Sequence, residues 1–254
     1  NFGAQVRGFH LHQARHWEPF AEEIRAAIAP GTKLVVVTNP HNPTGHVLSD
    51  EARRAILERS AEVGAWLLAD EVYQGAERNG RTTPSFWGSY DKTLITNGLS
   101  KAYGLPGLRI GWIVGPADMI EALWHRHDYA VIGPSRMSDV LAIQALRARD
   151  HIFRRTRGIL NHNYPLLEAW LKRFGELFRW RAPDAGAICF TRYHHRLGAL
   201  DLVERLRAEH SILLVPGEHF GMPNYLRIGF GNETKQLEEA LGELGKAFEK
   251  LLTD

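Results

Sequence analysis

Residues 97–112 read NGLSKAYGLPGLRIGW, and this stretch decides how the rest of the chain is interpreted. It follows the short apolar run Thr93–Thr96, which is typical of a buried strand. It carries two cations, Lys101 and Arg109, among several glycines. A lysine at the end of a strand, in a partly desolvated cleft, can act as nucleophile and base because burial lowers its pKa. Arg109 follows a Gly-Pro-Gly type of turn, as expected of a guanidinium directed at a phosphate. Two solvated charges on a surface loop are the simpler alternative.

Working outward from this stretch, apolar strands alternate with helical patterns through the first half of the chain. Each strand candidate is a short run of β-branched and aliphatic residues, and Ser49-Asp50-Glu51 supplies the cap and first-turn acids of a helix. Such alternation predicts an α/β fold with a doubly wound, mostly parallel sheet. The expected strands are Lys33–Thr38, Ala65–Ala69, Thr93–Thr96 and Leu108–Val114, the last antiparallel to some neighbours, and the expected helices span Trp17–Ile28 and 49–64.

The pattern changes in the second half. Helical spacing dominates from Pro116 to about Phe178, and its longest segment runs from Asp150 to Arg173. Strands and helices then mix without a regular alternation, which predicts a smaller α+β domain. We therefore expect a large domain over residues 1–149 and a small domain over 150–254, joined by the long helix. The expected strands here are Leu177–Arg181, Ala187–Tyr193, Ile212–Val215 and Tyr225–Phe230, and the expected helices are Ala199–Glu209 and Glu233–Leu252.

Composition excludes several classes of function. The chain has 254 residues, is 44% hydrophobic and 24% charged, and has a formal net charge of +2, so it gives no reason to expect binding to nucleic acid or to an anionic membrane. Its longest apolar runs have the length of strands, which predicts no membrane span. The single cysteine, Cys189, cannot form an internal disulfide and is consistent with a reducing, cytoplasmic location.

Two further stretches follow expected strands, where ligand sites of such sheets are built. Residues 39–45 read NPHNPTG, a stiff turn that can hold the Asn42 amide in one orientation; an ordinary connecting turn is an equally good interpretation. Residues 69–73 read ADEVY. Asp70 at a buried strand end needs a cationic or donor partner, and Tyr73 can add a phenol on the same side. An aspartate that caps the next helix is the commoner alternative.

Together, NPHNPTG, ADEVY and GLSKAYGLPGLRIGW, followed by YLRIGFG at 225–231, resemble the fold type I pyridoxal-phosphate enzymes. Within that group the chain resembles the class I/II aminotransferases, which are aspartate aminotransferase-like, over almost its whole length. The resemblance implies a large cofactor-binding domain of the pyridoxal-phosphate-dependent transferase type and pyridoxal 5'-phosphate as cofactor. It also implies amino-acid and 2-oxo-acid substrates and a homodimer.

The resemblance also implies a role for each motif residue. Lys101 bonds covalently to the cofactor aldehyde, and Asp70 pairs with the pyridine nitrogen. Tyr73 and Asn42 hydrogen-bond the phenolic oxygen, and Arg109 binds the phosphate. Arg227, assisted by Asn42, holds the carboxylate of the amino acid; an arginine in a surface ion pair is its alternative. Lys101, Asp70 and Tyr73 are thus the expected catalytic residues.

The chain departs from the family pattern in two places. Many relatives have a phosphate-contacting serine where this chain has Gly98, and Ser100 and Thr96 are candidates to replace it. The chain also opens at Asn1, and its residues Ala4–Leu11 resemble the strand shortly before the NPHNPTG motif. We therefore expect that the family's N-terminal portion, with its phosphate loop and ring-stacking aromatic residue, is not part of this sequence, which leaves the expected cofactor site incomplete.

Other activities remain open. The leading hypothesis is an aminotransferase that moves an amino group between an α-amino acid and a 2-oxo acid. A lyase, a decarboxylase or an amino-acid oxidase of the same fold would use the same cofactor residues, and an aminotransferase-like ligand-sensing domain of a transcriptional regulator is an alternative of another class. The thirteen histidines lack the cysteine or carboxylate spacing of a zinc site, so no metal is expected.

Overall fold

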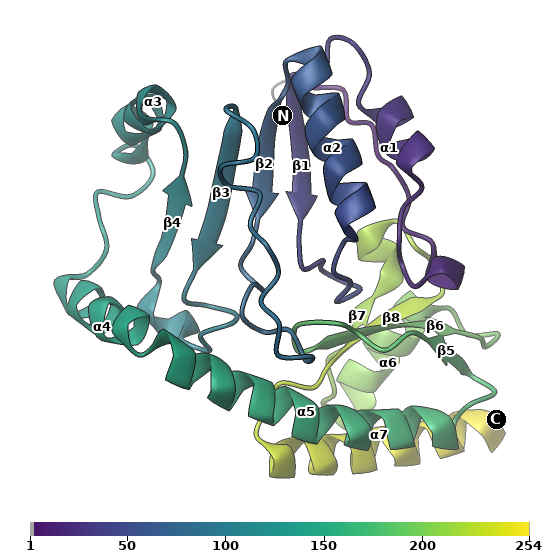
Figure 1. The fold of residues 1–254 in the computed structure, drawn as a ribbon. Helices are drawn as coiled ribbons and strands as arrows, with labels where there is room; N and C mark the ends of the chain where they lie inside the picture. The colour runs from purple at the N-terminus through teal and green to yellow at the C-terminus, as the bar shows by residue number, and fades with distance from the viewer. Residues whose placement is uncertain (1–2, 254) are drawn as a thin grey trace.

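The first half of the chain forms a mostly parallel four-stranded sheet. The structure is a computed structural model that describes residues 3–253, with side chains as far as Lys250 (Figure 1). The strand order is β1-β2-β3-β4, with β1, β2 and β3 parallel and β4 antiparallel to β3. The predicted sheet and its antiparallel last strand are thereby confirmed. The strands are β1 (Leu34–Thr38), β2 (Trp66–Asp70), β3 (Thr93–Gly98) and β4 (Gly111–Val114).

One face of this first sheet is covered by two helices, α1 (Ala21–Ala27) and α2 (Asp50–Val63). Helix α2 begins as the sequence indicates, because the Ser49 hydroxyl accepts a hydrogen bond from the Ala52 N–H at 3.1 Å. The alternate residues of each strand that face the helices are buried in one apolar cluster. That cluster includes Val35, Val37, Leu67, Ala69, Ile24 and Ile56.

The opposite face of the first sheet is exposed to solvent. Val36 of β1 is 58% exposed and Ile113 of β4 is 47% exposed. Asp70 and Thr96 are register partners, and Thr96 in turn pairs with Ile113, so all three lie on this open face. The first sheet therefore has one packed face and one open face, and Asp70 belongs to the open one.

The second half of the chain forms an antiparallel sheet in the order β5-β6-β8-β7. Its buried residues share one large apolar cluster with helices α5, α6 and α7. Helices α5 and α7 run side by side along the base of the molecule (Figure 1). The elements are α3 (Ala117–His127), α4 (Arg136–Arg147), α5 (Arg149–Arg173), β5 (Phe178–Trp180), β6 (Ile188–Tyr193), α6 (Ala199–His210), β7 (Val215–Pro216), β8 (Tyr225–Gly229) and α7 (Thr234–Thr253).

Three predicted segments are wrong at their ends, each because the backbone enters the left-handed region. The helix predicted from Trp17 begins only at Ala21, since Trp17 has φ 67° and its buried ring packs against aromatic residues of the second sheet. The strand predicted from Leu108 begins at Gly111, after a short 3₁₀ turn and Arg109 at φ 54°. The strand predicted at Ile212–Val215 is reduced to Val215–Pro216, after Ser211 at φ 55°.

Candidate active site

The three sequence motifs that follow the parallel strands meet at one edge of the first sheet. Thr38, Asp70 and Thr96 lie in register across β1, β2 and β3. The Asn39 N–H donates to the Asp70 carbonyl at 3.0 Å, and the Glu71 N–H donates to the Thr96 carbonyl at 2.8 Å. The carboxyl ends of the strands are thus level with one another, which is where α/β sheets bind ligands.

Asp70 and Tyr73 form the middle of this edge. The Asp70 Oδ1 accepts a hydrogen bond from the Val72 N–H at 3.2 Å, and the side chain is half-buried. Burial raises the pKa of the Tyr73 hydroxyl; the charge of Arg227 acts to lower this pKa, and the charge of Asp70 acts to raise it. Tyr73 therefore keeps its proton near neutral pH and lies within the electrostatic reach of both an anion and a cation. The chain turns after Asp70 and forms no α-helix between β2 and β3, so Asp70 does not cap a helix.

Asn42 and Arg227 are joined directly, although one follows β1 and the other lies on β8. The Arg227 Nη1 donates to the Asn42 Oδ1 at 3.0 Å. The guanidinium carbon also lies 5.5 Å from the centre of the Phe220 ring. Because the Asn42 oxygen accepts from Arg227, its Nδ2 remains the group with which the amide can donate to a ligand. Arg227 is half-buried and contacts the NPHNPTG turn, so the surface ion pair is not its environment.

His41, inside the same turn, is uncharged near neutral pH. Burial, assisted by the charge of His46, lowers the pKa of His41 to about 4. Its Nδ1 lies 2.9 Å from the Thr44 Oγ1, within the turn. His41 thus adds no positive charge beside Asn42 and stiffens the turn that carries it.

Lys101 lies on the loop next to the Tyr73 turn. The Ala102 N–H donates to the Val72 carbonyl at 3.4 Å, and Leu99 and Ala102 are both fully buried. The lysine between these anchors is exposed, and its carbonyl accepts from the Gly104 N–H at 2.9 Å. The backbone of the lysine loop is therefore fixed against the ADEVY motif, with the amine free to reach a ligand.

Arg109 is the candidate with the least support from geometry. It is exposed, and its Nη1 donates to the Pro106 carbonyl at 3.0 Å, within its own turn. Among the hydrogen bonds and ion pairs of residues 3–253, none joins the side chains of Lys101 or Arg109 directly to those of Asn42, Asp70, Tyr73 or Arg227. The structure thus brings four of the six candidates together and places the other two on the adjoining loop.

The glycine at position 98 has a steric reason. Gly98 is the register partner of Gly111 in the antiparallel pair of β3 and β4. A Cβ atom on Gly98 would lie 2.9 Å from the Ile110 carbonyl oxygen and 3.2 Å from the Gly111 Cα. A serine at this position requires the two strands to move apart. Of the two candidates to replace it, Thr96 shares the face of Asp70, and Ser100 is half-buried in the lysine loop.

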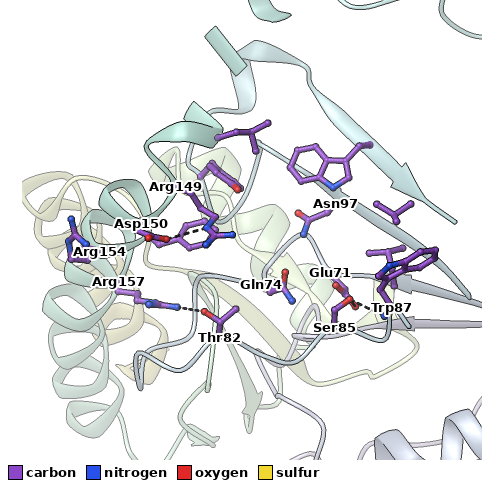
Figure 2. A pocket seen from close by; sticks show the side chains of 16 residues that line it. Glu71, Gln74, Thr82, Ser85, Trp87, Asn97, Arg149, Asp150, Arg154 and Arg157 are labelled. Carbon is purple, nitrogen blue, oxygen red and sulfur yellow. Dashed lines mark hydrogen bonds and ion pairs between the residues drawn. The ribbon is translucent and has the colours of Figure 1, made fainter. Parts of the chain in front are cut away.

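A cavity lies on the other side of the first sheet. It measures about 880 Å³, and Figure 2 shows Glu71, Gln74 and Asn97 across from Arg149 and Asp150 of α5. Asn97 projects from the face opposite to that of Thr96 and Asp70, since neighbouring strand residues alternate. The six candidate residues are not among those that line the cavity in the described part of the chain. The cavity is therefore separate from the strand-end site.

Two features of the site were not predicted from the sequence. Phe220 packs its ring by the Arg227 guanidinium, and residues 183–186 cross both the Asn42 turn and the Tyr73 turn. The only sequence signal for the second is the Pro-Asp-Ala-Gly string, which marks a turn and not a contact.

The donor set at the strand ends fits pyridoxal phosphate. The half-buried Asp70 carboxylate can pair with a protonated ring nitrogen, and the Tyr73 hydroxyl and the Asn42 Nδ2 can donate to a phenolic oxygen. The Lys101 amine can bond to an aldehyde, and Arg227 can receive a carboxylate. The part of the chain that the structure describes has no group of three or more histidine, cysteine or acidic side chains placed to hold a metal ion. Nor has it a helix that is both long enough and apolar enough to cross a membrane.

Known proteins share this architecture. The family model described as "Aminotransferase class I and II" matches residues 2–244. Capreomycidine synthase from Streptomyces vinaceus is 31% identical over 244 residues, which are 96% of this chain and 63% of that protein. An aspartate aminotransferase from Rhizobium meliloti is 28% identical over 256 residues, covering 91% of this chain and 60% of that protein. The crystal structure of a PLP-dependent aminotransferase from Streptococcus suis superposes with a TM-score of 0.89 at 33% identity, covering 98% of this chain and 66% of that one.

The fold is that of the pyridoxal-phosphate-dependent aminotransferases. The chain belongs to the class I and II aminotransferase family, as the sequence motifs predicted. Pyridoxal 5'-phosphate is the cofactor that this membership implies. The chain spans about three fifths to two thirds of the length of the relatives it matches.

Proposed function

We propose that this protein transfers an amino group between an α-amino acid and a 2-oxo acid, with pyridoxal phosphate bound at the strand-end site. The observation that carries the proposal is the hydrogen bond from Arg227 to Asn42. It brings a carboxylate-binding guanidinium from the second sheet to the edge of the first, where Asp70, Tyr73 and the lysine loop lie. A site that holds both cofactor and amino acid needs this combination.

Each residue has a defined task in this proposal. The bound cofactor supplies an electron-accepting ring, which makes the Cα proton of the amino acid labile. Asp70 keeps the ring nitrogen protonated, and Tyr73 and Asn42 donate to the phenolic oxygen. Lys101 would hold the cofactor through its amine, and this amine would also carry the Cα proton of the amino acid as general base and acid. Arg227 would bind the carboxylate of the amino acid and thereby fix the orientation of the substrate, which is an orientation effect. Arg109 is assigned to the phosphate.

The residues assigned to the cofactor are compatible with more than one reaction. Capreomycidine synthase, one of the similar proteins, is not named as an aminotransferase, so the family includes other chemistry. A lyase, decarboxylase or amino-acid oxidase would use the same Lys101 and Asp70, and the bond that breaks depends on residues around the substrate. A ligand-sensing domain of a regulator would bind the cofactor without turnover.

We also propose a two-domain organisation and a homodimer. The division falls at 149/150, where α5 begins after the elements of the first sheet. The dimer is supported by apolar side chains that the chain leaves in water on and before α4: Met137 is 76% exposed and Ile132 is 89% exposed. A cytoplasmic location is supported by the single cysteine, Cys189, which cannot form an internal disulfide.

The proposal is tested by mixing the protein with pyridoxal phosphate and a panel of amino acids. Transamination converts the bound cofactor to its amine form, which changes its absorbance, and releases a 2-oxo acid that accepts the amino group back in the reverse direction. Release of ammonia or CO₂ would assign the protein to a lyase or a decarboxylase instead. Cofactor binding with no product from any amino acid would favour the sensing domain.

A further inference from the structure

A short segment of the second half of the chain contacts both loops that carry the proposed cofactor ligands. This segment, Pro183–Gly186, connects β5 to β6 and is called the crossing segment below. The N–H groups of Asp184 and Ala185 both donate to the Gly45 carbonyl, at 3.0 and 2.9 Å. Gly45 ends the NPHNPTG turn, so the segment fixes that turn from outside.

The crossing segment also forms backbone hydrogen bonds with the turn that follows Tyr73. The Gly186 N–H donates to the Ala76 carbonyl at 3.0 Å, and the Arg78 N–H donates to the Asp184 carbonyl at 2.8 Å. Gly186 has φ +77°, and a Cβ atom there would lie 3.3 Å from the Tyr73 Cδ1. The backbone at Gly186 is therefore in contact with the Tyr73 ring.

The approach is so close that it requires glycine on the facing turn as well. A Cβ atom on Gly45, at φ +70°, would lie 2.5 Å from the Pro183 Cβ and 2.7 Å from the Ala185 carbonyl oxygen. The same chain continues into β6, where Phe190 is the register partner of Arg227. One continuous stretch thus connects the positions of Asn42, Tyr73 and Arg227.

Among the hydrogen bonds and ion pairs of the described residues, the Asp184 side chain alone joins the crossing segment to His46 and Val47, the two residues directly after the NPHNPTG turn. Its Oδ2 accepts from the Val47 N–H at 3.1 Å and lies 3.3 Å from the His46 Nδ1. The buried His46 ring also meets Glu18, with 2.6 Å between Nε2 and Oε2. Burial acts to raise the pKa of Asp184, but the His46 side chain, the Val47 N–H and the charges of His16 and His46 hold that pKa below its ordinary value.

We propose that Asp184 is a positioning residue for the strand-end site: by holding Val47 and His46, it sets the Asn42 turn against Arg227 and Tyr73. This inference rests on the proposed function, which assigns Asn42 to the cofactor and to the carboxylate-binding arginine. Asp184 is not assigned a contact with the cofactor or the amino acid. It acts by fixing the position of the NPHNPTG turn.

The first test measures the position of Asn42 without any cofactor. The side-chain amide signals of Asn42 are followed by ¹H–¹⁵N NMR in the unchanged protein and in Asp184→Ala, Asp184→Asn and Asp128→Asn. Asp128 is exposed at the end of α3 and serves as the matched control. We expect both Asp184 variants to shift the Asn42 signals, Asp184→Ala more strongly, and Asp128→Asn to leave them unchanged.

The second test measures the affinity for pyridoxal phosphate by its absorbance. Loss of a hydrogen bond to a charged group predicts about tenfold weaker binding in Asp184→Ala and about threefold weaker binding in Asp184→Asn. If Asp184→Ala fails to fold, Asp184→Asn decides. Unchanged Asn42 signals together with unchanged affinity in a folded Asp184 variant overturn the inference. Failure of the unchanged protein to bind pyridoxal phosphate would overturn the proposed function instead, and the NMR signals would still decide the role of Asp184.

Discussion

The two sheets of this molecule bury their residues in different ways. The second sheet is closed: Cys189, Phe190 and Leu226 have no solvent exposure, and their cluster includes α5, α6 and α7. The first sheet is packed on one face and leaves Val36 and Ile113 in water on the other. Yet the first sheet carries five of the six candidate site residues, and the second contributes Arg227. The second sheet is therefore the better packed of the two, whereas most of the residues assigned to the proposed function lie on the loops of the first sheet.

The largest expected effect concerns a loop of the first sheet. Lys101→Ala removes the amine that holds the cofactor and moves the proton, so we expect turnover to fall below detection and the absorbance of lysine-bound cofactor to vanish. Because Lys101 is exposed, the melting temperature should remain that of the unchanged protein. Lys92→Ala, an exposed lysine before β3, is the matched control and should keep its activity. Turnover of Lys101→Ala near the normal rate would remove Lys101 from the site.

The second effect also concerns chemistry and not stability. Asp70→Ala should leave some cofactor bound but raise the barrier to proton removal by about 3 kcal/mol, as expected when a stabilising charge is lost from a preorganised site. Single-turnover rates with an amino acid measure this step. An unchanged rate would show that the ring nitrogen does not depend on Asp70.

The third prediction compares the sheets directly by their stability. Leu226→Ala in the closed sheet removes a fully buried side chain and should lower the free energy of unfolding by about 2–5 kcal/mol. Val36→Ala in the open sheet removes a mostly exposed one, and surface substitutions change stability by only about 0.5 kcal/mol. Denaturant unfolding of both variants measures the contrast. Equal losses would show that the open face is covered in the protein in solution.

Elements that depend on local interactions could be predicted from the sequence, and elements that depend on long-range contacts could not. The β-branched run at β1 and the Ser49 cap of α2 are local patterns, and both elements form where they were expected. Trp17 was assigned to a helix by its spacing, but a long-range contact with Phe190 determines its conformation. Helical periodicity carries no information on such a contact.

The candidate site shows the same limit. The motifs place Asn42, Asp70 and Lys101 at strand ends because each follows an apolar run, and this placement is local. The bond from Arg227 to Asn42 and the crossing segment Pro183–Gly186 depend on how the second sheet packs against the first. The steric reason for Gly98 likewise needs the pairing of β3 with β4. These features became visible only in three dimensions.

A further expected effect is a pH dependence of stability that arises within the NPHNPTG turn. The pKa of His41 falls from its ordinary value of 6.5 to about 4 in the folded chain. The stability that neutral His41 contributes is therefore fully present above pH 6.5 and is lost as the pH falls towards 4. His41→Gln should unfold with a weaker pH dependence across this window than the unchanged protein. NMR titration of the His41 ring with a midpoint near 6.5 would contradict the burial of this side chain.

The most direct test of the central claim is to locate the lysine that binds the cofactor. The protein is incubated with pyridoxal phosphate, reduced with borohydride to make the bond permanent, digested and mapped by mass spectrometry. We expect one modified peptide, which carries the reduced cofactor on Lys101. Modification spread over exposed lysines such as Lys92 and Lys172, or the absence of a modified Lys101 peptide, would contradict it.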